Sequence, residues 1–252
     1  MVNYILADYK RVISRIPRLI FLVIYEVVFV VFVLNKWNNA AGHYNSVALL
    51  DDSQWFFYVW LSHILCLVDF IHSFTFDFQA KTIQVALGLG ISRLHVIFSK
   101  LIQTLLVMLT DLFITLAVFG LLCAITGTPM AGHQVMTLVY YGTGSVLLGI
   151  LCATLAMPLA FRTQNMVVTM VSYIVLSVGT ITHLLRLITR IGPAFMARLQ
   201  LDRFSPDSCT DQITANAITG NFQLLPVIVA IAWFAFGIYL TYLLFRKQEL
   251  DF

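Results

Sequence analysis

Six long runs of apolar residues, separated by short polar segments, dominate this sequence and restrict how it can fold. A helix crosses the hydrocarbon core of a bilayer with about 20 mostly apolar residues. Charged residues make up 11% of the chain and hydrophobic residues 60%, which leaves too little polar surface for a water-soluble exterior. We therefore predict an all-α polytopic membrane protein with a single transmembrane domain. The six predicted spans are residues 19–34, 55–76, 94–125, 135–161, 166–188 and 222–245.

The segment before the first span, residues 1–18, is predicted to form an amphipathic helix. Its apolar side chains recur at helical spacing, while Arg11, Arg15 and Arg18 recur on another face. This pattern is typical of a helix that lies in the membrane interface, with its arginines toward anionic headgroups. The alternative is a helical tail that packs on a partner protein.

The positions of lysine and arginine orient the spans, because cytoplasmic loops carry an excess of these residues. With the amino terminus inside, the inner segments hold ten of the 15 lysines and arginines. We expect both termini and the segment 77–92 on the cytoplasmic side, and the long loop 189–221 outside the cell. The net charge of +3 is too small to indicate a nucleic-acid partner.

The sequence carries no signature of an enzyme. Its longest polar stretch is about 33 residues, well below the size of a domain. It has no G-x-x-x-x-G-K-[ST] loop, no H-E-x-x-H, no G-x-S-x-G and no cysteine and histidine cluster with metal spacing. We therefore expect no catalytic residue, no metal site and no cofactor in this chain.

Ionisable and polar side chains inside the spans are the best functional candidates, because each charge is costly in hydrocarbon. Asp69 and His72 share one helical face of the second span. Gln103 and Asp111 share one face of the third span, and Glu26 lies in the first. These residues form either a polar translocation path or hydrogen bonds that only hold the helices together. Two further interpretations are a proton relay and a metal site, each built from Asp69, His72 and Asp111.

The segment between the second and third spans combines helix-starting and helix-ending residues. Asp77 can cap a short helix from Phe78 to Leu87, which Gly88 and Gly90 would end. Ser92 can then cap the third span. The apolar edge of this short helix holds Ile83, Ala86 and Leu87. The alternative is a simple tight loop resting on the bilayer.

A set of residues in and after this segment carries a resemblance to a known family. They are Asp77, Phe78, Lys81, Thr82, Ile83, Leu87, Gly90, Ile91, Ser92, Arg93 and Lys100. The set resembles the segment at the same topological place in type-2 permeases of ATP-binding cassette (ABC) transporters, especially from Gram-positive bacteria. The rest of the chain is similar in its amphipathic start, six spans and long outer loop before the last span. Lys81 departs from the pattern, because glycine is frequent at that place.

The resemblance implies a mechanism and a set of partners. In the family, residues corresponding to 78–90 form a coupling helix that docks on a separate ATP-binding subunit. In this chain the coupling residues would be Asp77, Phe78, Lys81, Thr82, Ile83, Leu87, Gly90, Ser92 and Arg93. Arg93 and Lys100 would sit at the inner interface, and the loop 189–221 would correspond to short helices near the exit. Two ATPase subunits, which bind ATP and Mg²⁺, would drive two permease chains, identical or homologous. The cargo would be amphipathic or hydrophobic, a peptide first of all, exported across a bacterial cell membrane.

Other functions would use the same residues differently. A secondary transporter driven by protons would use Asp69 and Asp111 and would work without ATP. No inverted repeat is evident in the sequence, which counts against it. An intramembrane enzyme, and a sensor subunit that binds an ATPase without moving cargo, are the remaining alternatives.

Overall fold

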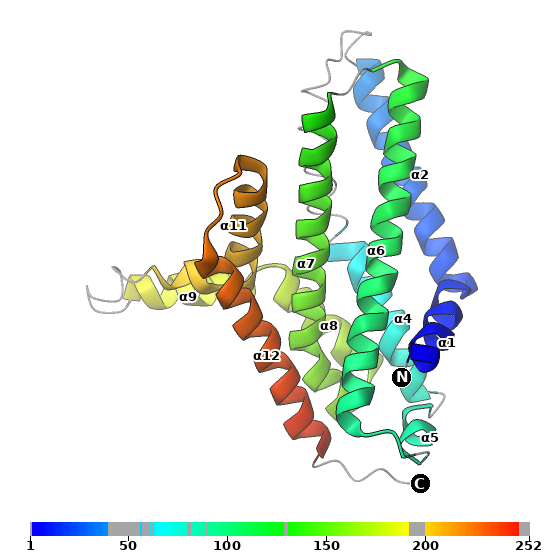
Figure 1. The fold of residues 1–252 in the computed structure, drawn as a ribbon, viewed down its shortest axis with the longest axis vertical. Helices are drawn as coiled ribbons and strands as arrows, with labels where there is room; N and C mark the ends of the chain where they lie inside the picture. The colour runs from blue at the N-terminus through cyan, green and yellow to red at the C-terminus, as the bar shows by residue number, and fades with distance from the viewer. Residues whose placement is uncertain are drawn as a thin grey trace.

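A computed structural model describes residues 2–39, 56, 61, 63–79, 82–88, 90–128, 131–191 and 200–246. These residues fold into helices and connections, without a strand (Figure 1), which confirms the predicted all-α class for them. The elements are α1 (Val2–Ile13), α2 (Ile16–Asn39), α4 (Cys66–Gln79), α5 (Thr82–Gly88), α6 (Arg93–Thr126), α7 (Gly132–Thr163), α8 (Met166–Ser177), α9 (Thr180–Ile191), the 3-10 helix η2 (Leu201–Phe204), α11 (Pro206–Thr219) and α12 (Leu224–Arg246).

Four of these helices, α2, α6, α7 and α12, are long and apolar enough to cross a membrane. The pair α8 and α9 passes the same test together, although its two halves are bent by 51°. These helices indicate a multi-pass membrane protein. Within the described residues there are thus four or five candidate spans, where the sequence predicts six. The remaining predicted span, 55–76, corresponds to the shorter α4, and most of residues 55–62 lie outside the described part.

The third, fourth and sixth predicted spans agree with α6, α7 and α12 to within three residues at each end. Local capping explains why α6 can be placed so closely. The Ser92 hydroxyl accepts a hydrogen bond from the His95 backbone N–H at 3.3 Å, as the predicted cap requires. Gly127 ends the helix in a left-handed conformation with φ of 65°.

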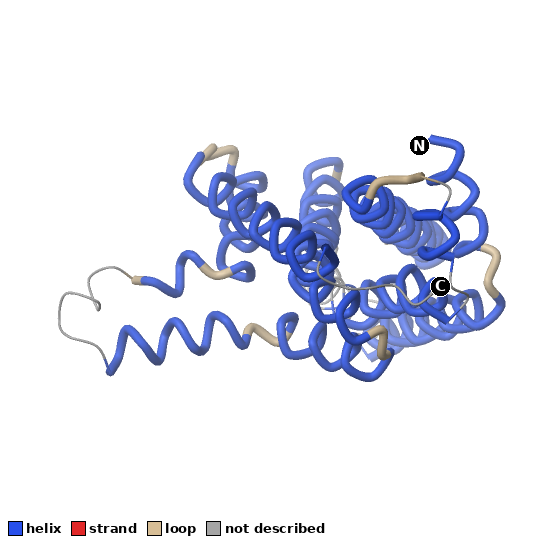
Figure 2. Tube along the Cα trace, turned by 90° about the horizontal axis from the view of Figure 1, so that it is seen from below, coloured by secondary structure: helices blue, strands red, loops and turns tan. Residues whose placement is uncertain are grey.

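The predicted span over residues 166–188 is broken into two helices, α8 and α9. Helix α8 ends at Ser177, and Gly179 has φ of 78°, a conformation that favours glycine. A Cβ at this position would lie 2.5 Å from the Asp207 Oδ2 atom, so the close approach of α11 also requires glycine. Beyond the bend, α9 leaves the bundle sideways (Figures 1 and 2). The apolar run continues across the break, which explains why hydropathy alone predicts a single span.

The predicted outer loop 189–221 contains two helices, η2 and α11, and its residues 192–199 lie outside the described part. Ser205 caps α11 by accepting a hydrogen bond from the Ser208 N–H at 3.3 Å. Pro206 follows at the start of the helix, where its missing N–H costs nothing. This segment therefore folds back on the bundle as structured protein.

Helix α7 forms the centre of the bundle. In the apolar stretch of α7 that is long enough to span a membrane, 83% is buried inside the protein. The corresponding share is 17–39% in the other three long helices. Small residues allow the close packing around it. A Cβ on Gly149 of α7 would lie 2.8 Å from the Cys66 side chain of α4, and a Cβ on Gly237 of α12 would lie 2.8 Å from the Thr154 backbone oxygen of α7.

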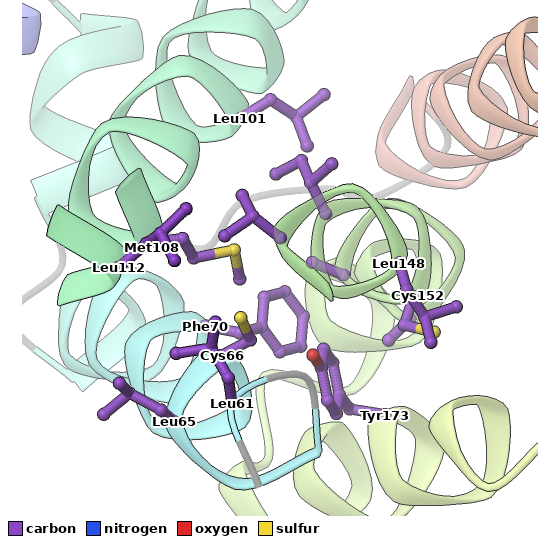
Figure 3. Packing of buried hydrophobic residues seen from close by; sticks show 14 of the residues in the cluster. Leu61, Leu65, Cys66, Phe70, Leu101, Met108, Leu112, Leu148, Cys152 and Tyr173 are labelled. Carbon is purple, nitrogen blue, oxygen red and sulfur yellow. The ribbon is translucent and has the colours of Figure 1, made fainter. Parts of the chain in front are cut away.

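Buried aliphatic and aromatic side chains fill the space between α4, α6, α7 and α8. Figure 3 shows Phe70 of α4 and Tyr173 of α8 at the centre of this packing, and their stacked rings have centroids 5.5 Å apart. Met108 of α6 and Leu148 of α7 flank them, and all four side chains are buried. The core thus ties the two halves of the chain together.

Candidate functional site

A buried ion cluster joins α2, α4 and α6. Arg18, at the start of α2, is 2% exposed and lies between Asp69 of α4 and Asp111 of α6. Its Nε donates to Asp69 Oδ1 at 3.0 Å, and its Nη2 donates to Asp111 Oδ1. All three groups have been removed from water, so each depends on its partners for compensation of its charge. We call this group the Arg18 cluster.

The Arg18 cluster has unused capacity for hydrogen bonds. The second carboxylate oxygens, Asp69 Oδ2 and Asp111 Oδ2, are buried and have no hydrogen-bond partner within the described residues. Buried polar atoms in proteins almost always have a partner. Two carboxyl groups share one guanidinium here, so the cluster is chemically able to take up a proton or a water molecule.

Glu26 extends the cluster along the contact between α2 and α6. The Thr115 hydroxyl of α6 donates to Glu26 Oε1 at 2.6 Å. The other Glu26 carboxylate oxygen is buried and lacks a hydrogen-bond partner among the described residues. Helix α2 therefore presents both a cation, Arg18, and a carboxyl group, Glu26, to α6.

A second buried cluster fastens α1 to α6. Lys100 of α6 is fully buried and donates to the Asp8 carboxylate of α1 and, at 3.1 Å, to Gln103 Oε1. Asp8 also pairs with Arg11 of its own helix. We call this group the Lys100 cluster. The lysine that the family resemblance assigns to the inner interface therefore has its charge paired inside the protein.

The predicted interfacial placement of residues 1–18 is wrong for two of its charges. Asp8 is buried against α6, and the Tyr9 hydroxyl of the same helix lies 2.7 Å from Thr110 Oγ1 of α6. Arg18 points into the bundle rather than toward lipid headgroups. The physical reason is that two carboxylates, Asp69 and Asp111, would otherwise be buried without a counter-charge.

The residues predicted along a translocation path therefore divide between several places. Asp69 and Asp111 bind Arg18, Glu26 accepts a hydrogen bond from Thr115 one turn beyond Asp111, and Gln103 belongs to the Lys100 cluster. The His72 ring Nδ1 lies 2.9 Å from the Val68 carbonyl oxygen, one turn back in its own helix. In the described ranges, no group of three or more histidine, cysteine, aspartate or glutamate side chains is arranged to hold a metal ion.

The sequence identified the acidic residues but not the basic residues that pair with them. Helical spacing shows which residues share a face of one helix, and it does not show which helix packs against that face. The available signal was the position of Arg18 at the edge of an apolar run, where a buried charge needs an acidic partner in another span.

The segment between α4 and α6 forms the short helix α5, at one end of the bundle (Figure 1). Helix α4 continues to Gln79, so Asp77 and Phe78 lie inside it, and the prediction that Asp77 caps a helix beginning at Phe78 is wrong. The physical reason is that the α4 backbone stays helical through both residues. Helix α5 begins at Thr82, and Lys81 lies outside the described residues.

The outward side of α5 differs from the predicted apolar edge. Ile83 is 3% exposed and belongs to the hydrophobic core, and Leu87 packs partly against the same core. Val85, by contrast, is 61% exposed. The edge that holds Ile83 therefore attaches α5 to its own bundle, and the opposite side, with Val85, is available to a partner.

The turn from α5 into α6 is held by specific contacts. Gly90 has φ of 84°, and its N–H donates to the Leu87 carbonyl oxygen at 3.0 Å. The Arg93 guanidinium donates to the backbone oxygen of Phe245. It also lies 5.1 Å from the centre of the Phe245 aromatic ring. These contacts connect the start of α6 to the end of α12. A hollow of about 350 Å³ beside the turn is lined by Tyr4, Gly90, Ile91, Ser92, His95 and Ser99.

Comparison of the sequence with known protein families and with curated proteins finds no match.

Proposed function

We propose that this chain is the transmembrane permease subunit of an ATP-driven exporter of the ABC type. The observation that carries the proposal is α5, a short helix between two long helices, at the end of the bundle, with its outward Val85 uncovered. A partner that pushes on such a helix acts on α4 and α6 together. The family resemblance of residues 77–93 supports the same role.

Buried ion pairs give this proposal a mechanical route. The Arg18 cluster ties α2 to both helices that flank α5, and Arg93 ties the start of α6 to the end of α12. A displacement at α5 is therefore transmitted to α2 and α12 without a long flexible segment. Rigid contacts of this kind are one physical route by which coupling can pass between distant sites.

The proposal includes partners, topology and cargo. Two ATP-binding subunits, which hold ATP and Mg²⁺, supply the energy, and a second permease chain, identical or homologous, completes the pathway. The proposed topology has six spans, with both termini in the cytoplasm of a bacterium. Arg162 and Arg246, at the ends of α7 and α12 near α5, support this orientation. The cargo is amphipathic or hydrophobic, and a peptide is the first class to test.

The first experiment is co-expression with a candidate ATP-binding subunit, followed by purification in mild detergent. The matched variants are Val85→Asp, on the outward side of α5, and Val135→Asp, at the 47% exposed start of α7 at the other end of the bundle. We expect wild type and Val135→Asp to retain the ATPase in stoichiometric amount and Val85→Asp to lose it. If Val85→Asp still retains the ATPase, α5 is not the contact. If folded wild type does not associate with the ATPase, the proposal is wrong.

The second candidate is a proton-driven secondary transporter that uses Asp69 and Asp111. The observation in its favour is the pair of unpartnered carboxylate oxygens in the Arg18 cluster. It predicts uptake or export in vesicles with a proton gradient and no ATPase, and loss of that transport in Asp111→Asn. Transport that requires ATP and persists when the gradient is collapsed would exclude it.

A further inference from the structure

We propose that α9 lies in the headgroup layer of the bilayer, with one side in the acyl chains and a basic ridge on lipid phosphates. The proposal does not depend on transport. It rests on three observations about a helix of 12 residues that the sequence pattern assigned partly to a span and partly to a loop.

The first observation is an exposed apolar side. Leu184, Leu187 and Ile188 recur at intervals of three and four residues, and they are 54%, 51% and 47% exposed. Thr182, on the opposite side of the helix, is buried and donates to Asp207 Oδ2 at 2.8 Å. The polar side of α9 is therefore fixed to α11, and the helix turns its leucines outward.

The second observation is a basic ridge between the packed and the apolar sides. His183, Arg186 and Arg190 follow one another at intervals of three and four residues, and all three are exposed. Arg186 Nε lies 3.6 Å from Asp202 Oδ2, yet its side chain is 46% exposed, so the rest of its guanidinium can reach another anion. A planar guanidinium suits the oxygens of a phosphate group. An apolar side next to a basic ridge is typical of helices in the membrane interface.

The third observation identifies the occupant as lipid. Val175 and Val178, at the end of α8, are 45% and 59% exposed, so exposed apolar side chains lie on α8 just before the bend as well as on α9 after it. The 51° bend turns α9 away from the direction of α8, and Figures 1 and 2 show that it runs out sideways from the bundle. The apolar side of α9 is therefore an extension of the lipid-facing surface of an apolar helix.

Spin labels on the two sides of α9 test the proposal in the full chain. The native cysteines are all buried, so a label reacts with an introduced cysteine; they are Cys66, Cys123, Cys152 and Cys209. The labels replace Leu187 on the apolar side and Arg190 on the ridge, in vesicles of phosphatidylcholine with or without phosphatidylglycerol. We expect the label at 187 to collide more with oxygen than with a water-soluble nickel chelate, and the label at 190 to show the reverse. Equal access of the chelate to both labels would overturn the proposal, as would dipolar broadening at 187 from a second copy of the chain.

The phosphate contact has its own test. With phosphatidylglycerol present, the label at 187 should move deeper, because the intact basic ridge then binds an anionic headgroup. Arg186→Gln should abolish that shift and leave the depth in pure phosphatidylcholine unchanged. A depth that does not respond to phosphatidylglycerol, or a shift that survives Arg186→Gln, would refute the basic ridge as the lipid contact.

Discussion

Arg18 shows how one side chain can decide the packing of three helices. Its guanidinium binds one carboxylate on α4 and another on α6. An arginine at the start of a helix is normally exposed, so these two carboxylates explain its burial. Buried ion pairs contribute little net stability compared with apolar packing, but breaking one is expensive. The cluster therefore acts chiefly on which helices pack together.

We predict that Arg18→Met lowers the free energy of unfolding by about 3–5 kcal/mol, since two buried carboxyls lose their counter-charge. Thermal unfolding in detergent measures the effect, with the exposed Arg203→Met as the control. Adding Asp69→Asn and Asp111→Asn to Arg18→Met should restore part of the loss, because no charge is then left uncompensated. If Arg18→Met alone is as stable as Arg203→Met, Arg18 does not compensate the two buried carboxyls.

Two glycines in apolar helices are predicted to respond oppositely to alanine. A Cβ on Gly237 meets the Thr154 backbone oxygen at 2.8 Å and its carbon at 3.0 Å, and backbone cannot move aside cheaply. Gly237→Ala should cost about 1–3 kcal/mol through overpacking of α12 on α7. A Cβ on Gly120 of α6 meets nothing within 4 Å, so Gly120→Ala should stabilise by about 0.5–1 kcal/mol. Equal effects in an unfolding assay would show that α7 and α12 are less closely packed than described.

At the scale of residues, the sequence predicts which side chains carry buried charge, but not which side chains pair with them. Asp69 and Asp111 stand out in a sequence because a charge in an apolar run is rare and costly. That they meet the same arginine follows from the arrangement of three helices, which helical spacing within one helix cannot show.

At the scale of elements, the attachment of α1 to α6 is the clearest feature that the sequence did not predict. It is joined to α6 through Lys100 and Asp8, and through the contact of Tyr9 with Thr110. A helix of 12 residues is marginal in isolation, so its order depends on this attachment.

We predict that Lys100→Met releases α1 from α6. Amide hydrogen exchange over residues 4–13 should accelerate by at least tenfold, because the buried Asp8 carboxylate loses its partner. The matched control is Lys10→Met, at an exposed position of α1, which should leave the exchange unchanged. Similar acceleration in both variants would mean that the Lys100 cluster does not hold the helix.

The folding stability contributed by the buried Asp207 carboxyl, where α11 meets α9, is predicted to fall as pH rises. Burial raises the pKa of the Asp207 carboxyl, although the hydrogen bond from Thr182 partly opposes the change. The folded protein then holds a proton that the unfolded chain releases above about pH 3.9, so stability is lost as pH rises from that value through the raised pKa. Thermal stability of wild type relative to Asp207→Asn should fall across that window. A relative stability that rises with pH would contradict the burial of this group.

The helices themselves were largely predictable, and the exceptions have a physical reason. The ends of α6 follow from Ser92 and Gly127, which are local signals. The bend at Gly179 was missed because apolar residues continue on both sides, and only the close approach of Asp207 shows why a glycine is needed there. The inward turn of Ile83 was missed because a helix of seven residues can present either side to its bundle.

At the scale of the whole molecule, the contacts form a connected frame. Central α7 packs against α4, α6, α8, α11 and α12, while the ion clusters attach α1 and α2 to α6. Helix α5 lies at one end of this frame, and α9 extends from its side (Figure 1). The proposed function assigns the first to a partner that supplies energy, and the further inference assigns the second to lipid.

The most direct test of the central claim is photo-crosslinking from α5 in membranes that contain a candidate ATP-binding subunit. A photoreactive amino acid replaces Val85 in one variant and Val135, at the far end of α7, in the other. The account predicts a crosslink to the ATP-binding subunit from position 85 and none from position 135. A crosslink from position 135 alone, or from neither position in a complex that binds ATP, would contradict the claim that α5 couples this chain to an ATPase.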